Sequence, residues 1–507
     1  MKKYGVAALI GMLFSPNIFA CLPDVKRSLD MAVEYTKKME LRGDNFDDIW
    51  YNSLNKNEDL IPDIIIAYGQ AGCWEEAINI AKSIQNKNSE QQNKKYAYAI
   101  SNLAIIKAFN GDYDAAKNML GELKYQSQKS NNNYGTLTIA EIMAKHKSLA
   151  DALALIKSNR YIDKSSYTNI LENLLSTGQI DLARTESKNT SNIEILFPYI
   201  KYLSEHGKKS EAYNILEKAY DDLTEKDRCY WGTVLIAMSY ARFDDIEKIH
   251  NISNKINEDD KLLILALSVP HIQSKNSKIE LEQNIQENFI KLTQEKKIRY
   301  LNQIAESYSL VGDLREFVSL IKKISSDIDN RFQIQLAAIS FIETAIYKGN
   351  LPLAKKSSEI LLPYMTKTSM DDYYIMQSFI ATEESNFNKA YESAKNITLS
   401  SPQPFIYASS KNIDFKLLYD WYNYSINNKQ CTPISCVQVL SARAASLNTH
   451  FDPIELLKTE EPAIIARSWF GYAQGKMKIT PGKEYILNPI ILGSSYSNEK
   501  LLYQLYK

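Results

Sequence analysis

The sequence predicts an all-α protein, an α-solenoid of about ten stacked helix-turn-helix repeats, and three observations support this. A glycine, or a weaker substitute, recurs along the chain with a small or apolar residue five positions later. Glycine and proline are scarce, at 17 and 14 of 507 residues, which suits long helices joined by short turns. Segments that alternate apolar and polar residues are few, so no sheet domain is expected.

The recurring pairs have the period of a repeat protein. Successive anchors are separated by 39, 36, 31, 29, 34, 71, 37 and 36 residues. Periods in this range are typical of stacked helical hairpins, and the doubled interval predicts one divergent hairpin, with helices at 261–272 and 279–292. The stronger pairs are Gly72/Ala77, Gly111/Ala116, Gly178/Ala183, Gly207/Ala212 and Gly349/Ala354, and the weaker ones are Lys147/Ala152, Ala241/Ile246, Gly312/Phe317 and Ser385/Ala390.

The segment 61–84 shows why this spacing indicates a hairpin. Apolar residues from Ile61 to Tyr68 recur at helical spacing and form one buried stripe. Gly72 tolerates positive φ, so it can end the helix and turn the chain. Glu75 then suits the positive end of the next helix dipole. Ala77 is small, so the second helix can approach the first closely.

The same pattern returns at 103–123 and 301–324, and it resembles the tetratricopeptide repeat. The likeness rests on the Gly-Asp-Tyr turn at 111–113, on a tyrosine four residues before the glycine, as at Tyr68 and Tyr308, and on the small residue five after it. It covers roughly residues 58–400. The resemblance implies a right-handed superhelix that binds a protein or peptide along its surface. Leu174, Leu203 and Ala345 replace the tyrosine elsewhere, so no peptide-binding residue is carried over.

Five segments follow along the chain. We expect a signal peptide at 1–20, an N-terminal capping helix within 21–57, the solenoid at 58–400, further hairpins at 401–477 and an irregular C-terminal cap at 478–507. The further hairpins comprise helices at 415–427 and 435–446, then a segment at 454–477. Polar runs such as 85–95 and 127–134 are expected to be solvated loops between hairpins.

The first 20 residues have the three parts of a secretory signal peptide. Lys2 and Lys3 give a positive start, residues 6–14 are apolar, and a cleavage site follows at Ala20. The apolar run is too short for a stable membrane anchor. The protein is therefore expected to be exported, to the periplasm or beyond the cell. Cys21 would follow the cleavage site directly, so lipidation of Cys21 is a second hypothesis, under which the protein would be anchored to the envelope.

Five cysteines in an exported chain allow disulfides and leave at least one thiol over. Cys431 and Cys436 flank a Thr-Pro-Ile-Ser turn, which makes a local disulfide between them easy to form. A metal site there is the rival, but two thiolates without a nearby histidine make a poor one. Cys73 lies in the first turn and could reach Cys21 if the N-terminal helix packs back.

No constellation for catalysis, cofactor binding or metal binding is evident. The five histidines are isolated in sequence, and no phosphate-binding loop or nucleophile elbow is complete. Glu306-Ser307 matches the acid motif of some lytic transglycosylases, which carry a helical superhelix, but it lies inside a repeat helix. A cell-wall-associated enzyme, or a helical accessory to one, therefore stays the alternative function. The histidines are His146, His206, His250, His271 and His450.

Charge and tyrosine content bear on the partner. The 60 basic and 60 acidic residues balance, which argues against general attraction to nucleic acid or to an anionic membrane. Tyrosine is abundant, at 33 residues, and its apolar ring with a polar tip suits binding surfaces. Clustered tyrosines cannot all face inward on one helix, so a partner surface is expected at Tyr373, Tyr374, Tyr419, Trp421, Tyr422 and Tyr424.

These observations favour an exported, non-enzymatic scaffold without cofactors. It would bind another protein or a peptide through its concave face, by contacts spread over several repeats. The sequence leaves the partner, the pathway and the oligomeric state open.

Overall fold

The computed structural model is all-helical over the residues it describes. These are 21–42, 60–85, 89–123, 129–146, 149–158, 175, 178, 180–188, 193–221, 231–255, 258–292, 294–324, 331–365, 370–449, 452, 457, 459 and 461–478. None of them lies in a β-strand. The expected signal peptide at 1–20 and all but the first residue of the expected C-terminal cap at 478–507 lie outside the described residues.

The chain forms two compact units. Unit 1 combines the described residues within Met1–Ile162 and Leu399–Ile486, and unit 2 comprises those within Asp163–Thr398. Unit 1 therefore joins the two ends of the described sequence, whereas the described part of unit 2 is one continuous stretch.

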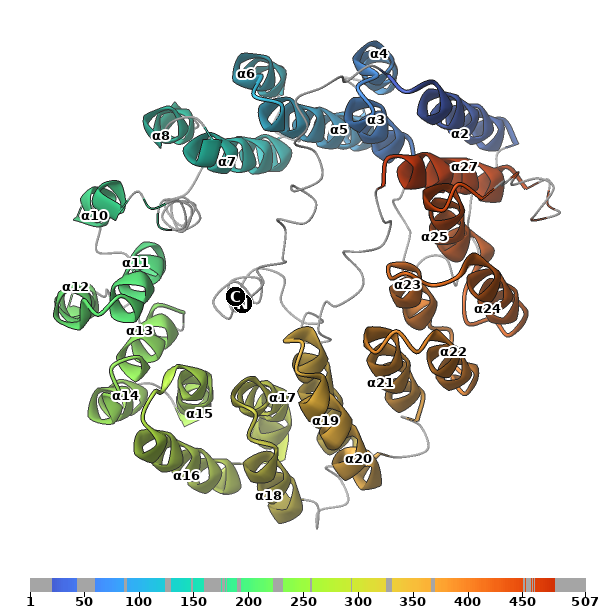
Figure 1. Cartoon of the computed structure of the whole chain (residues 1–507). Coiled ribbons are helices and arrows are strands. Elements are labelled where there is room, and N and C mark those ends of the chain that lie inside the picture. The colour runs from blue at the N-terminus through green and yellow to red at the C-terminus, as the bar shows by residue number, and fades with distance from the viewer. Residues whose placement is uncertain are drawn as a thin grey trace. The chain divides into compact units, whose positions relative to one another are not determined.

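Unit 1 is a stack of hairpins in which alternate helices contact each other. Helices α3, α5 and α7 pack in one row, and α23, α25 and α27 pack in another, while the helix between two members of a row covers its neighbours (Figure 1). The helices are α2 (Pro23–Arg42), α3 (Leu60–Gln70), α4 (Trp74–Ile84), α5 (Glu90–Phe109), α6 (Tyr113–Gly121), α7 (Lys129–His146), α8 (Leu149–Ser158), α23 (Gln403–Ser409), α24 (Phe415–Asn427), α25 (Pro433–Ser446) and α27 (Pro462–Lys476).

Unit 2 repeats this arrangement in two layers. Helices α11, α13, α15, α17, α19 and α21 contact one another in succession and form the first layer; the even-numbered helices form the second (Figure 1). The helices are α10 (Ile180–Lys188), α11 (Ile193–Glu205), α12 (Lys209–Asp221), α13 (Trp231–Ala241), α14 (Ile246–Ser253), α15 (Glu258–Ser268), η3 (Val269–His271), α16 (Lys275–Lys291), α17 (Gln294–Val311), α18 (Leu314–Ile324), α19 (Arg331–Tyr347), α20 (Leu351–Leu361), η5 (Leu362–Tyr364), α21 (Met370–Glu383) and α22 (Phe387–Lys395).

One turn design joins the helices of a hairpin, and the turn at Gly111 is representative. Gly111 has φ of +81°, and the backbone N–H of Asp112 donates to the carbonyl of Lys107 at 2.9 Å, which closes the end of α5. The Asp112 carboxylate then accepts from the N–H of Ala115 and caps α6. A single glycine thus ends one helix, and the next residue starts the other.

The predicted glycine anchors all adopt this conformation. The glycines with positive φ are Gly72, Gly111, Gly178, Gly207, Gly312 and Gly349. The side chain five positions after the anchor is fully buried for every predicted pair except Ala241/Ile246, as follows: Ala77, Ala116, Ala152, Ala183, Ala212, Phe317, Ala354 and Ala390. The residue at this position therefore faces the neighbouring helix, and its size limits how closely the two helices approach.

One anchor was assigned in the wrong register. The Ala241/Ile246 pair does not mark the turn between α13 and α14, because positive φ falls on Asp244. The fully buried residue five positions later is Ile249. Asp244 can replace glycine here because its carboxylate accepts from the backbone N–H groups of Gln273 and Ser274, at 2.8 Å each. These bonds stabilise a backbone conformation that aspartate adopts more easily than most residues.

A second expectation, a solvated loop at 127–134, is wrong from residue 129 onward, because α7 begins at Lys129. The Asn132 amide donates to the carbonyls of Leu120 and Leu123, at 3.0 and 3.4 Å. It thereby gives a further donor to the Leu120 carbonyl in the last turn of α6 and to the Leu123 carbonyl just beyond that helix. Asn132, whose polar side chain suggests a loop in the sequence, therefore caps one helix from the next.

Helix α2 occupies the position expected for an N-terminal cap, but it has a second neighbour. It packs against α3 and also along α27, so the first and last described helices contact each other within unit 1 (Figure 1). Its buried face includes Val25, Leu29, Ala32 and Val33. None of the described helices is long and apolar enough to span a bilayer.

Candidate functional site

A cleft between α10, α11 and α12 of unit 2 is the best candidate binding site among the described residues. Its volume is about 280 Å³, just below the range of pockets that hold drug-sized ligands. Leu196 from α11 with Ile215 and Ala219 from α12 supplies the apolar part of its lining. Its polar lining consists of Arg184, Ser187, Lys188, Tyr199, Glu211, Asn214 and Lys218.

Arg184 is held in place by two carboxylates, one of which also accepts a hydrogen bond from Tyr199. Its Nε donates to Glu211 Oε1 at 3.3 Å, and its Nη1 donates to Asp181 Oδ1 at 3.4 Å. The Tyr199 hydroxyl donates to the same Glu211 oxygen at 3.4 Å. Among the described residues that line the cleft, Glu211 is the one carboxylate, and it is already engaged by Arg184 and Tyr199.

Lys188 and Lys218 differ from Arg184, because neither ammonium has an ion-pair or hydrogen-bond partner among the described residues. They lie on α10 and α12, two of the three helices that line the cleft, and both side chains are exposed. Arg184 and Lys188 are four residues apart and therefore share one face of α10. The described lining of the cleft consequently carries an excess of two positive charges beside its apolar part, which is formed by Leu196, Ile215 and Ala219.

The opposite side of α12 is occupied by a network that joins it to α13 and α14. The Tyr240 hydroxyl donates to Glu217 at 2.5 Å, and Lys248 approaches the same carboxylate at 3.0 Å. Tyr213 donates to Asp245 at 2.8 Å, and its ring forms a T-shaped, edge-to-face contact with that of Tyr240. The charged groups of this network have partners within it. We therefore infer that it stabilises the packing of adjacent hairpins.

A buried carboxyl lies farther along unit 2. Glu282 on α16 is only 4% exposed, and its nearest cation is Lys278, whose Nζ lies 3.5 Å from Oε1 and 3.2 Å from Asp313 Oδ2. Burial is the main cause that raises the pKa of Glu282 to about 7; the nearby Lys278 opposes this rise, and the charges of Asp313 and Glu316 add to it. Glu282 therefore exchanges its proton near neutral pH.

The predicted tyrosine surface is wrong at two of its residues. Trp421 and Tyr422 on α24 are 1% and 6% exposed, and both rings pack near Phe405 of α23. Tyr419 and Tyr424 on the same helix are partly exposed, as are Tyr373 and Tyr374 on α21. These four belong to two different units, so they are treated as separate surfaces.

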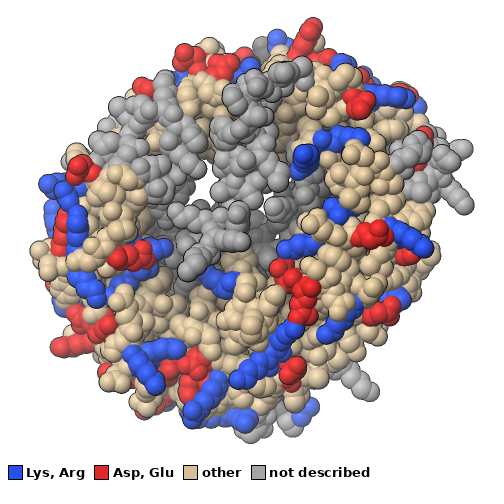
Figure 2. All heavy atoms as spheres, viewed as in Figure 1, with Lys and Arg blue, Asp and Glu red and all other residues tan. Residues whose placement is uncertain are grey.

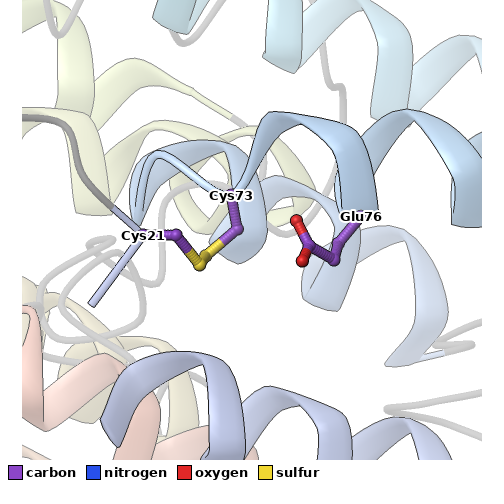
Figure 3. Close-up of side chains that lie close together, drawn as sticks. All are labelled: Cys21, Cys73 and Glu76. Atoms are coloured by element: carbon purple, nitrogen blue, oxygen red, sulfur yellow. A yellow bond between two sulfur atoms is a disulfide. The ribbon is translucent and has the colours of Figure 1, made fainter. Parts of the chain in front are cut away.

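Cys431 and Cys436 are joined by a disulfide, with Cα atoms 6.3 Å apart, and Cys21 and Cys73 are joined by another, with Cα atoms 4.6 Å apart. The second bond ties the start of α2 to the turn between α3 and α4 (Figure 3). Glu76 lies beside it and forms an ion pair with Lys26 at 3.3 Å. The two sulfurs and the Glu76 carboxylate are close enough to hold a metal, but bonded sulfurs do not supply thiolates.

The residues that suggested other chemistry have packing roles where they are described. Ser307 donates from its buried hydroxyl to the carbonyl of Ala266, so the Glu306-Ser307 motif is part of the contact between α17 and α15. His206 stacks on Tyr202, and His271 lies 3.0 Å from the buried Arg242. Burial and the charges of Arg242 and Lys201 hold the pKa of His271 well below its usual value. His450 lies outside the described residues.

The sequence reasoning missed the cleft of Arg184, Lys188 and Lys218. The spacing of Arg184 and Lys188 was a local signal, but Lys218 joins them only through the packing of α10 against its neighbours. The sequence matches no protein-family model and no curated protein.

Proposed function

We propose that this protein is an exported α-solenoid, similar to tetratricopeptide-repeat proteins, that binds a protein or peptide partner along an extended surface. The observation that carries the proposal is the repeated turn, in which a residue of positive φ is followed directly by a helix start and, five positions on, by a buried side chain. A turn of this type that recurs along the chain favours a similar packing of successive hairpins. Contacts to a partner can then be spread over several hairpins.

The charge distribution favours a partner that carries both positive and negative groups. On the face shown in Figure 2, basic and acidic side chains lie interspersed over the described residues, between uncharged ones. A surface of this kind gives no general attraction to polyanions, and it favours specific complementary contacts. Protein partners therefore fit better than nucleic acid.

The disulfide at Cys21 bears on the lipid-anchored alternative. A lipid thioether and the bond to Cys73 both require the Cys21 sulfur, so one chain cannot carry both. The disulfide favours a scaffold without a lipid anchor. Mass spectrometry of the mature N-terminal peptide, before and after reduction, distinguishes the two, because only the disulfide form releases its partner peptide on reduction.

Site-specific photo-crosslinking in the native envelope tests the proposal. A photoreactive residue is placed at Lys201 or Tyr374 in the first layer, and at Glu247 or Lys356 in the second. We expect adducts with one and the same protein from at least two hairpins. Adducts with no protein at any position, or with peptidoglycan fragments alone, would contradict the proposal and favour a cell-wall-associated enzyme or its helical accessory.

A further inference from the structure

We infer that the cleft between α10, α11 and α12 binds an acidic segment of a protein partner, with carboxylate side chains placed against Lys188, Lys218 and Arg184. This inference rests on the proposed function, since it names the chemistry of the partner at one site. The site lies mainly on second-layer helices, whereas the sequence predicts binding on the concave face of the solenoid.

The charges of the cleft give the first reason. Three cations line it, and the one carboxylate among the lining residues accepts hydrogen bonds from Arg184 and Tyr199. Lys188 and Lys218 have no partner among the residues that the structure describes, so their ammonium groups are free to meet a ligand. An anionic group between them would gain two ion pairs without breaking an existing one.

The preorganisation of Arg184 gives the second reason. Its contacts to Glu211 and Asp181 fix the guanidinium at the cleft, so little side-chain entropy is lost when an anion approaches. The Asn214 side chain adds an exposed amide from α12, which can donate to a carboxylate oxygen.

The size and floor of the cleft give the third reason. A volume of about 280 Å³ accommodates one or two side chains rather than a large cofactor. Leu196 and Ile215 offer apolar contact to the methylene groups of a glutamate. These dimensions match an acidic peptide segment that lies across the cleft and inserts its side chains.

Binding of a short glutamate-rich peptide, measured by isothermal titration calorimetry, tests the inference, with the glutamine version of the peptide as the uncharged control. The wild-type protein should bind the glutamate peptide at least tenfold more tightly. The double variant Lys188→Glu/Lys218→Glu should bind it about tenfold more weakly, since each exposed ion pair contributes on the order of 0.5–1 kcal/mol. Raising the salt concentration should reduce the affinity of the wild type.

Lys208→Glu/Lys209→Glu is the matched control, because it changes the net charge equally at exposed lysines that do not line the cleft. It should change the affinity less than twofold. Equal binding of both peptides, no binding of either, equal loss in the two double variants, or displacement of the peptide by equimolar inorganic phosphate would each overturn the inference.

Crosslinking with the Lys188→Glu/Lys218→Glu variant separates this inference from the proposed function. Loss of the partner adducts supports both. Adducts that persist unchanged leave the scaffold function standing and overturn the role of the cleft.

Discussion

The hydroxyl of Ser441 on α25 lies 2.7 Å from that of Ser468 on α27, and both side chains are fully buried. Two small residues continue this crossing along α27, because a Cβ on Gly471 would overlap the carbonyl of Gln438, and one on Gly475 would overlap that of Ala442. Backbones this close leave no room for a methyl group. The crossing therefore depends on glycine at both positions.

Replacing Gly471 by alanine should destabilise unit 1 by about 1–3 kcal/mol, the usual cost of overpacking, even though alanine favours a helix. Thermal unfolding followed by circular dichroism measures the effect. Gly121→Ala is the matched control, since a Cβ on Gly121 meets nothing within 4 Å. A Gly471→Ala protein as stable as the control would show that the two helices can separate without cost.

The positive φ of the turn residues predicts opposite changes in stability for two substitutions. A Cβ on Gly111 would meet nothing within 4 Å, but its φ is +81°, so Gly111→Ala should cost about 1 kcal/mol through backbone strain alone. Ser385 has φ of +60° without being glycine, so Ser385→Gly should stabilise the protein by several tenths of a kcal/mol. Urea unfolding of both variants measures these changes, and shifts of the same sign would contradict the account.

The buried Glu282 carboxyl predicts a pH dependence of stability in unit 2. Its folded-state pKa of about 7 exceeds the ordinary value of 4.5, so the folded state holds the proton more tightly than the unfolded state. The contribution of Glu282 to stability is complete below about pH 4.5 and is lost as the pH rises through about 7. The loss amounts to about 3 kcal/mol.

Hydrogen exchange of the α16–α18 amides, corrected for intrinsic rates, measures this dependence. The Glu282→Gln variant should lack it and should gain stability relative to the wild type as the pH rises from 5 to 8. Glu287→Gln changes an exposed glutamate on the same helix, and its pH profile should follow that of the wild type. Parallel profiles for wild type and Glu282→Gln would exclude the carboxyl as the source.

The two disulfides should differ in their contributions to stability. Cys21 and Cys73 are 52 residues apart, whereas Cys431 and Cys436 are 5 apart. The loop entropy of the unfolded chain predicts that Cys21→Ala/Cys73→Ala costs about 4 kcal/mol and Cys431→Ala/Cys436→Ala about 2 kcal/mol. Urea unfolding without reductant measures both, and the opposite order would argue against an entropic origin.

The hairpin turns could be predicted from the sequence because their requirement is local. Glycine adopts positive φ at the lowest energetic cost, so the turns at Gly72 and Gly312 could be predicted directly from the sequence. The turn at Asp244 was misplaced because its conformation depends on acceptance from Gln273 and Ser274, which the chain brings close only by folding.

The binding surfaces were harder to predict because exposure depends on packing between helices. Trp421 and Tyr422 appeared too crowded for one buried face, yet α23 covers both of them beside Phe405. Lys218 becomes part of a cleft only when α10 and α12 enclose it. Composition and spacing indicate which helices form, but not which of their polar side chains converge.

The contact between α2 and α27 has a consequence for the order in which the chain folds. Unit 2 is continuous in its described part, so its hairpins can form as they are synthesised. Helix α2 must wait for α27, which is separated from it by almost the whole chain, before its apolar face is fully covered. Until then the part of that face that α27 covers stays exposed to solvent, and the bond between Cys21 and Cys73 can hold α2 beside α3.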